Sequence, residues 1–239
     1  MTPRATGLDE LHGDKLVAAL ERLFDTSTVD LEIGNREFSI LRPRNSDDLI
    51  REEDFVMDER LPYWADIWPS SHVLATHLVS LAGGSRERVR RRGLELGCGV
   101  GLVTMAAMTA GYDMISTDYY TDALAFTRAN AWRNLSVEPE TRMIDWRSFP
   151  VDAQGFDLIL ASDVLYEKEY AELLPSIFRN ALAPGGMVII ADPGRIGVPE
   201  FKDECARVGL DIRAKTTHPF EIGEVRQSID LYEVADARS

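Results

Sequence analysis

A chain of 239 residues is long enough to bury the core of one α/β domain with an N-terminal addition. The formal net charge of −14 argues against nucleic acid as a partner, because a polyanion would approach a surface of its own sign, and it favours a basic partner. The only cysteines, Cys98 and Cys205, do not make a disulfide framework, and neither a signal peptide nor an apolar run of roughly 18 residues is present. We therefore expect a cytoplasmic protein that does not bind a membrane.

The first part of the chain predicts a small lobe. Apolar residues at helical spacing predict an amphipathic helix over Leu8–Phe24, and the Gly34-Asn35 pair between two β-rich runs predicts a β-hairpin. A further helix is expected over SSHVLATHLVSL, because the preceding Pro69 suits a first helical turn. We expect residues 1–60 to form the helix and hairpin lobe and residues 61–239 to form the main domain.

From about residue 93 onward, short apolar runs alternate with helical segments, which is typical of a parallel sheet covered by helices on both faces. The predicted strands are Gly93–Cys98, Asp113–Asp118, Thr141–Trp146, Phe156–Asp163 and Met187–Asp192. The predicted helices are LVTMAAMTAG, a helix capped by Thr121, Tyr170–Leu182 before a Pro184-Gly185-Gly186 stop, and Pro199–Val208. The last two β runs, DIRAKTTH and RQSIDLYEV, have no helix between them and predict an antiparallel edge.

The sharpest local signal is LELGCGVGL, Leu94–Leu102, which leaves an apolar strand and enters a helix. Glycine at positions 97, 99 and 101 lets the backbone turn tightly and come close to a ligand, while the helix N-terminus offers free N–H groups. Asp118 ends the next apolar run, where a carboxylate can accept hydrogen bonds from two ribose hydroxyls. Together these features predict a nucleoside site.

Two nucleoside ligands compete for this loop. A dinucleotide site prefers the spacing G-x-G-x-x-G and leaves the helix end open for a pyrophosphate. Here the spacing is G-x-G-x-G, and Glu95 stands just before the first glycine. Because a carboxylate repels phosphate but can hold an ammonium, the loop favours S-adenosylmethionine.

Acidic residues also end the next two predicted strands. At Asp145-Trp146 a carboxylate can accept the adenine amino hydrogen and a backbone N–H can meet a ring nitrogen, while Asp163 ends the fourth strand with Tyr166 three residues on. Ligands of open parallel sheets gather outside the carboxyl ends of the strands. We therefore expect Glu95, Asp118, Asp145 and Asp163 to converge on one rim.

The stretches LELGCGVG, STDYY, IDW and SDVLY resemble the motifs of class I, seven-β-strand methyltransferases, in the group that methylates lysine or N-terminal amines of proteins. PYWADIWP, DVLY and ADPGR are most similar to the methyltransferases that act on lysines of the electron-transfer flavoprotein β subunit. The resemblance covers about Leu61 to Arg195. It implies an α/β fold with a Rossmann-like, mostly parallel sheet of seven strands in three layers, and direct in-line methyl transfer.

The resemblance also implies roles for individual residues. Catalysis is expected of Asp163 and Tyr166. Contacts to S-adenosylmethionine, which leaves as S-adenosylhomocysteine, are expected of Trp68, Glu95, Gly97, Cys98, Gly99, Gly101, Asp118, Tyr119, Asp145, Trp146 and Ser162. The substrate channel is expected to include Tyr63, Trp64, Asp66 and Arg195.

Several of these residues have a second interpretation. Trp64 and Trp68 could instead pack the N-terminal lobe onto the sheet. Asp66 fits either a substrate contact or a solvated turn acid, and Arg195 fits either a substrate contact or a structural ion pair. The basic run RERVRRR is interpreted as a solvated connection rather than a phosphate contact.

Three functions remain open from the sequence. The first is methylation of a lysine or other amine of a protein, and the second is N-methylation of a small amine or pyridine-like metabolite. The third is a non-catalytic scaffold that binds the cofactor, which the intact acids and glycines disfavour. We expect no metal site, because the four histidines are not arranged as ligands, and a monomer.

Overall fold

A seven-stranded sheet runs through the computed structural model, which describes residues 7–50, 61–81 and 91–238. The strand order is β5-β4-β3-β6-β7-β9-β8, with parallel pairing from β5 to β7 and antiparallel pairing of β9 with both β7 and β8. The strands are β3 Arg91–Leu96, β4 Tyr112–Asp118, β5 Glu140–Met143, β6 Phe156–Ser162, β7 Leu182–Asp192, β8 Leu210–Ile222 and β9 Val225–Asp236. The predicted fold class, with its antiparallel C-terminal edge, is confirmed.

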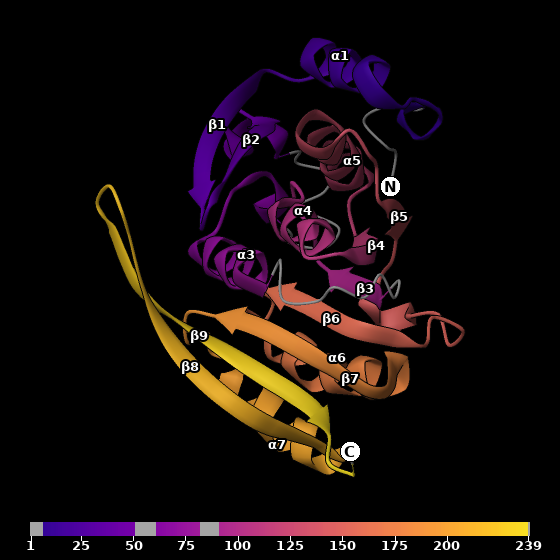
Figure 1. The fold of residues 1–239 in the computed structure, drawn as a ribbon, viewed down its shortest axis with the longest axis vertical. Coiled ribbons are helices and arrows are strands. Elements are labelled where there is room, and N and C mark those ends of the chain that lie inside the picture. Colours follow the sequence, from indigo (N-terminus) through magenta and orange to yellow (C-terminus); the bar gives the residue numbers. More distant parts are fainter. Residues whose placement is uncertain (1–6, 51–60, 82–90, 239) are drawn as a thin grey trace.

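Helices cover both faces of this sheet, so that the molecule has three layers (Figure 1). One face carries α3 Pro69–Leu81, α4 Leu102–Thr109 and α5 Thr121–Leu135, and the other carries α6 Lys168–Ala181 and α7 Val198–Arg207. Pro69 opens α3 as predicted, and Cys205 of α7 is buried. In the described parts of the chain, no helix combines the length and apolar character needed to cross a bilayer.

Successive residues of β6 point into two separate hydrophobic cores. Leu158 and Leu160 pack with α3 and α4, whereas Ile159 and Ala161 pack with α6 and α7. Alternation across a strand places every second side chain on the same face, so a strand buried on both faces needs an unbroken apolar run. This requirement explains why the sequence signals the central strands so clearly.

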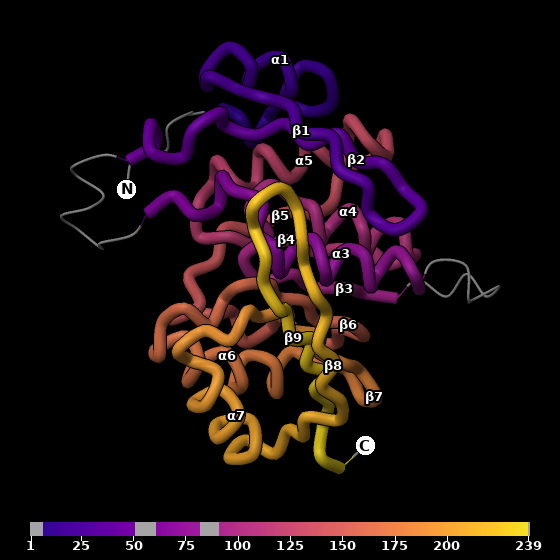
Figure 2. The backbone as a smooth tube through the Cα atoms, turned by 90° about the vertical axis from the view of Figure 1, so that its left-hand side faces the viewer, coloured from indigo at the N-terminus to yellow at the C-terminus, as the bar shows by residue number. Residues whose placement is uncertain are grey.

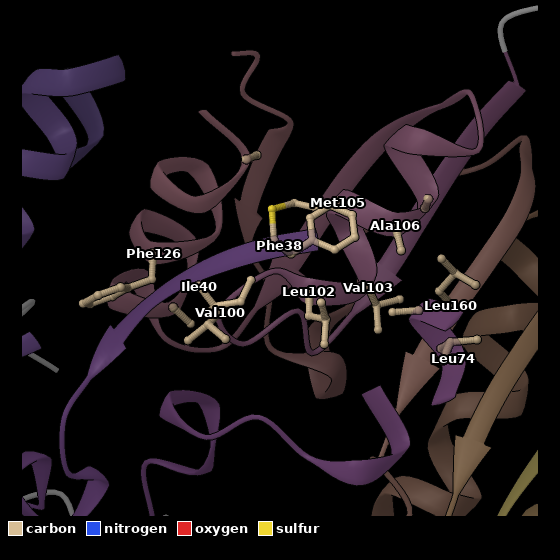
Figure 3. Packing of buried hydrophobic residues seen from close by; sticks show 14 of the residues in the cluster. Phe38, Ile40, Leu74, Val100, Leu102, Val103, Met105, Ala106, Phe126 and Leu160 are labelled. Atoms are coloured by element: carbon tan, nitrogen blue, oxygen red, sulfur yellow. The ribbon is translucent and has the colours of Figure 1, made fainter. Parts of the chain in front are cut away.

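The N-terminal lobe lies on the outer side of α4 and α5. The predicted hairpin is present as β1 Thr26–Ile33 and β2 Arg36–Pro43, with Gly34 at a φ of 62° in the turn, and α1 Gly13–Leu23 packs on α5. Phe38 and Ile40 of β2 belong to the same buried cluster as Leu102 and Met105 of α4 (Figure 3). The hairpin therefore completes the core on this face.

Asn130 of α5 joins this hairpin to the glycine loop. Its side chain is fully buried; it accepts from the Leu41 N–H at 2.7 Å and donates to the carbonyls of Leu41 and Val100 at 2.8 and 2.9 Å. Three backbone groups from two distant segments thus depend on one amide.

We expect Asn130→Ala to lower the free energy of unfolding by about 2–4 kcal/mol, because three buried backbone groups lose their partner. Urea unfolding followed by circular dichroism measures this change. Asn134→Ala is the matched control on the same helix: Asn134 bonds the Ser39 N–H and carbonyl but is only partly buried, so water can replace it and the loss should be smaller. Equal losses in the two variants would contradict the role given to burial.

The hairpin of β8 and β9 extends beyond the carboxyl end of β7 (Figures 1 and 2). Asp230 pairs with Asp192, the last residue of β7, and Thr217 pairs with Asp230 in turn. Residues 218–229 therefore continue past that end of the sheet. Phe220 closes the contact with α3, where its ring centre lies 5.3 Å from that of His72.

The predicted helix over Leu8–Phe24 is wrong in its first part. A 3-10 turn spans Leu8–Glu10, the chain is extended at His12, and α1 begins at Gly13. The cause is the buried Arg128, whose guanidinium donates to the carbonyls of Leu8, Asp9 and Leu11. These carbonyls bond to a side chain of α5 instead of to a continuing helix.

The cap predicted at Thr121 is also wrong. Thr121 is the first residue of α5, and Tyr120 occupies the N-cap, where its side chain makes no capping hydrogen bond. The third predicted strand is too long, because β5 ends at Met143 and the Asp145 carboxylate caps a short 3-10 turn over Trp146–Ser148.

The Pro184-Gly185-Gly186 segment does not act as a helix stop. The preceding helix already ends at Ala181, and β7 begins at Leu182, so this segment lies within the strand. Of the basic run, residues 86–90 lie outside the described residues, as do residues 51–60 of the predicted lobe. Arg91 and Arg92 open β3, and the Arg92 guanidinium lies 4.7 Å from the Phe156 ring centre.

Candidate active site

A cavity of about 370 Å³ lies at the carboxyl ends of the parallel strands. This volume falls within the usual range of small-ligand pockets. The predicted site residues that line it are Tyr63, Trp64, Asp66, Trp68, Glu95, Gly97, Cys98, Gly99, Asp118, Tyr119, Asp145, Trp146, Ser162, Asp163 and Tyr166. Gly101 and Arg195 are the predicted residues that do not line it. The four strand-end acids thus share one cavity.

The backbone conformation of the glycine loop disfavours larger residues at all three glycines, and close neighbours also crowd Gly99 and Gly101. Gly97, Gly99 and Gly101 have φ values of 76°, 53° and 89°, which side chains disfavour. A Cβ at Gly99 would lie 3.0 Å from the Trp64 carbonyl oxygen, and one at Gly101 would lie 2.9 Å from the Thr127 Cα. Gly99 therefore permits the aromatic segment, residues 61–71, to cross the loop, whereas Gly101 permits close packing on α5.

Glu95 is buried at the end of β3, with 1 % of its surface exposed. The Thr104 hydroxyl donates to its carboxylate, and Thr104 in turn pairs with the Ser116 hydroxyl at 2.7 Å. Burial, with a smaller contribution from the neighbouring Asp118, raises the pKa of Glu95 to about 8 against the opposing hydrogen bonds from Thr104. A cation entering the cavity would stabilise the ionised form.

The Asp118 carboxylate is fixed in place by the backbone. The N–H of Gly99 donates to its Oδ2 and the N–H of Tyr120 donates to its Oδ1, both at 3.0 Å. Burial raises the pKa of Asp118 in spite of these bonds. Because a carboxylate oxygen can accept two hydrogen bonds, both oxygens keep capacity for hydroxyl donors.

Asp145 is paired with Arg147, a residue that sequence reasoning missed. The Arg147 guanidinium donates to both carboxylate oxygens, with Nη2 2.6 Å from Oδ2. The neighbouring Trp146 packs edge to face on Tyr170 at a ring-centre distance of 5.1 Å. The Asp-x-Arg spacing in the sequence could have indicated this pair.

Asp163 has a strained backbone and a carboxylate that accepts one hydrogen bond at each oxygen. Its φ of 58° lies in the left-handed region, which is uncommon for any residue but glycine. Ser70 of α3 donates to Oδ2 at 3.3 Å, and Arg195 donates through Nε to Oδ1 at 2.6 Å. Strain of this kind is retained where it places a side chain, here at the cavity wall.

Asp192 holds the turn that carries Arg195. Its Oδ1 accepts from the N–H groups of Gly194 and Arg195 at 2.7 and 2.6 Å, and its Oδ2 is buried without a partner among the described residues. Burial raises the pKa of Asp192 to about 6. The Asp-Pro-Gly sequence indicates such a turn, although it does not reveal the contact with Asp163.

Aromatic rings form a continuous chain of edge-to-face contacts beside the cavity. The contacts run from Trp68 to Tyr63, Tyr166, Tyr170 and Trp146, with ring-centre distances of 5.9, 5.9, 5.8 and 5.1 Å in that order. The Trp68 indole N–H also donates to the Tyr63 carbonyl at 2.9 Å. Each ring is thus oriented by its neighbours.

Trp64 and Asp66 of the same segment face other partners. Trp64 is 8 % exposed and packs on Phe126 in the core, 5.6 Å between ring centres, while it also borders the cavity. Asp66 accepts a hydrogen bond from Arg42 of β2 at 2.7 Å. The segment is therefore tied both to the core and to the N-terminal hairpin.

The sequence matches the family described as lysine methyltransferase over residues 54–197, a range that includes all the residues that line this cavity. The chain belongs to the lysine methyltransferase family.

Curated relatives in this group carry related names. The chain is 30% identical to the electron transfer flavoprotein beta subunit lysine methyltransferase of Danio rerio, over 68% of this chain and 61% of that protein. It is 33% identical to the protein-lysine methyltransferase METTL21E of Mus musculus, over 48% of this chain and 50% of that protein. The chain thus spans between half and two thirds of the length of these two relatives.

Solved structures share the fold of this family member. The magnesium protoporphyrin IX methyltransferase of Synechocystis with bound SAM aligns with a TM-score of 0.57 at 15% identity, covering 80% of this chain and 97% of that chain. TrmN from Thermus thermophilus aligns with a TM-score of 0.54 at 20% identity, covering 76% of this chain and 50% of that chain. At such identities the likeness shows the fold alone.

Proposed function

We propose that the protein is an S-adenosylmethionine-dependent N-methyltransferase that transfers a methyl group directly to a lysine or another amine of a protein. The observation that carries this proposal is the single cavity that contains Glu95, Asp118 and Asp163 beside the glycine loop and the aromatic chain. Membership of the lysine methyltransferase family and the names of the curated relatives support it.

The residues of the cavity fit this cofactor. The glycine loop leaves room for close approach of a ligand, the buried Glu95 suits an ammonium, and Asp118 keeps hydrogen-bonding capacity for a pair of hydroxyls. Asp145, Trp146 and Ser162 would complete its surroundings. When bound, S-adenosylmethionine supplies a methyl carbon that its sulfonium makes electrophilic.

The protein's own residues would position the acceptor. Asp163 would accept an N–H hydrogen bond from the amine and stabilise the positive charge that develops on nitrogen, with Tyr166 next to it. Tyr63 and Trp68 would offer aromatic faces to the sulfonium of the cofactor and to the acceptor nitrogen as it becomes charged, and they would help exclude water. The amine must be neutral when it attacks, and the methylated nitrogen then loses a proton to solvent.

We propose further that the protein acts in the cytoplasm as a monomer, without nucleic acid or membrane. The acidic net charge and two free, buried cysteines support this setting. In this proposal residues 61–239 form the catalytic domain, and residues 1–60 form a lobe that supports the site through Asn130 and the Asp66–Arg42 pair.

The proposal is tested with methyl-labelled S-adenosylmethionine, the purified protein and a host extract separated into protein and small-molecule fractions. We expect label in a discrete protein band. Label confined to the small-molecule fraction would overturn the protein acceptor in favour of a small amine. Absence of both label and cofactor binding would overturn the enzyme itself.

A further inference from the structure

Arg195 already contacts the groups that would attract a cationic acceptor. Its Nε lies 2.6 Å from Asp163 Oδ1, and its guanidinium carbon lies 5.7 Å from the centre of the Trp68 ring. A carboxylate and an aromatic face are the groups that attract a primary ammonium. The protein thus places a permanent cation of its own beside the acid assigned to the acceptor.

The backbone of Arg195 is held in place by Asp192. The fully buried Asp192 accepts the backbone N–H of Arg195, which fixes the start of the side chain. The Arg195 side chain is 37 % exposed, whereas that of Asp163 is only 5 % exposed, so the guanidinium covers the carboxylate from outside the cavity. The ion pair raises the pKa of Arg195, which therefore stays cationic wherever a lysine titrates.

Asp163 is also held on its other oxygen. Ser70 donates to Oδ2, so the carboxylate has one donor on each oxygen and keeps lone pairs for one more N–H. A neutral amine needs only such an acceptor. An ammonium would instead meet a carboxylate whose charge is already partly offset, together with repulsion from the guanidinium.

We propose, resting on the function proposed above, that Arg195 is a specificity-determining residue: it offsets part of the charge of Asp163 so that the acceptor site selects the neutral amine over the ammonium. The proton of the acceptor passes to bulk water before the amine enters. Arg195 thereby makes binding of the acceptor depend on its prior deprotonation.

The test measures binding of n-butylammonium, which resembles the end of a lysine side chain, by following the Trp68 indole N–H in NMR spectra. Because no cofactor is present, the outcome does not depend on methyl transfer. We expect Arg195→Gln to bind n-butylammonium about tenfold more tightly than the wild type, since an unpaired carboxylate favours a nearby cation. Arg195→Lys, which keeps the charge, should bind like the wild type.

Two controls separate this effect from a general change. Arg179→Gln removes the same charge from an ion pair with Asp236 outside the cavity and should leave the affinity unchanged. The double variant Asp163→Asn/Arg195→Gln should lose the gain. Thermal melts establish folding, and Arg195→Ser replaces Arg195→Gln if the latter is unfolded.

Unchanged or weaker binding by folded Arg195→Gln would overturn the proposal, as would an equal gain in Arg195→Lys. A second readout is the pH profile of transfer to the labelled protein band, which Arg195→Gln should shift upward by about one pH unit because the acceptor holds its proton more tightly. If neither the wild type nor the variants transfer a methyl group, the proposed function is overturned. The n-butylammonium measurement would still test whether Arg195 offsets the charge of Asp163.

Discussion

Asp163→Asn is expected to slow methyl transfer about 100- to 1000-fold while cofactor affinity changes little, because the loss falls on orientation of the acceptor and on the charge that develops at nitrogen. Asparagine is the informative substitution here. It keeps the size of aspartate and tolerates the left-handed backbone at φ 58°, whereas alanine would add strain. Single-turnover rates with labelled cofactor measure transfer, and calorimetry measures binding.

Asp118→Asn provides the matched contrast. Asp118 lies in the same cavity, but the Gly99 and Tyr120 N–H groups hold its carboxylate at the glycine loop. It should weaken cofactor binding more than it slows the bound complex. Transfer by Asp163→Asn at close to the wild-type rate would show that Asp163 does not act on the acceptor.

Glu95→Gln is expected to weaken cofactor binding roughly 10- to 100-fold above pH 8, since a buried charged acceptor is lost. The size of the effect depends on pH because burial raises the pKa of Glu95 to about 8. Below that value the free protein holds a proton on this carboxyl. A cationic ligand stabilises the ionised form, so binding releases the proton, and wild-type affinity should rise from about pH 6 to about pH 8.

Calorimetry in buffers of different ionisation enthalpy counts the protons released. The wild type should release protons near pH 7, and Glu95→Gln should not. The same raised pKa means that the ionised carboxyl destabilises the free fold, so the wild type should lose stability as pH rises toward 8 and the variant should not share this loss. Equal proton release by both proteins would show that Glu95 does not meet the cationic end of the ligand.

The strand-end acids could be placed from sequence because strand type and chain order alone determine where they lie. Glu95, Asp118 and Asp163 each follow or end an apolar run, and parallel strands bring those ends together. The structure adds their different surroundings. Glu95 is buried beneath a hydroxyl, whereas Asp163 is paired with a guanidinium, and no local pattern distinguishes these two settings.

The partners of these acids could not be predicted from sequence. Ser70 comes from α3 and Arg195 from the turn after β7, and they meet at Asp163 only because helix and sheet pack in one particular orientation. Arg128 is similar. It draws three carbonyls out of the predicted N-terminal helix from a distance of more than a hundred residues along the chain. Local propensity carries no information about such contacts.

The aromatic segment shows a second limit of prediction from sequence. The resemblance implies that Tyr63, Trp64 and Trp68 of LPYWADIWPSS lie at the ligand site, but the sequence could not separate rings with different surroundings. In the structure Trp64 is buried on Phe126 in the core and only borders the cavity, whereas Trp68 and Tyr63 are more exposed and lie at the cavity, Tyr63 beside Tyr166. Burial, not residue type, divides these side chains.

The most direct measurement uses methyl-deuterated S-adenosylmethionine with host proteins from cells that lack this protein, followed by mass spectrometry of peptides. The account predicts that a lysine or other amine of a discrete protein gains the deuterated methyl group with the wild type and not with Asp163→Asn. Deuterium that appears only in small molecules, or equally with both proteins, would contradict it.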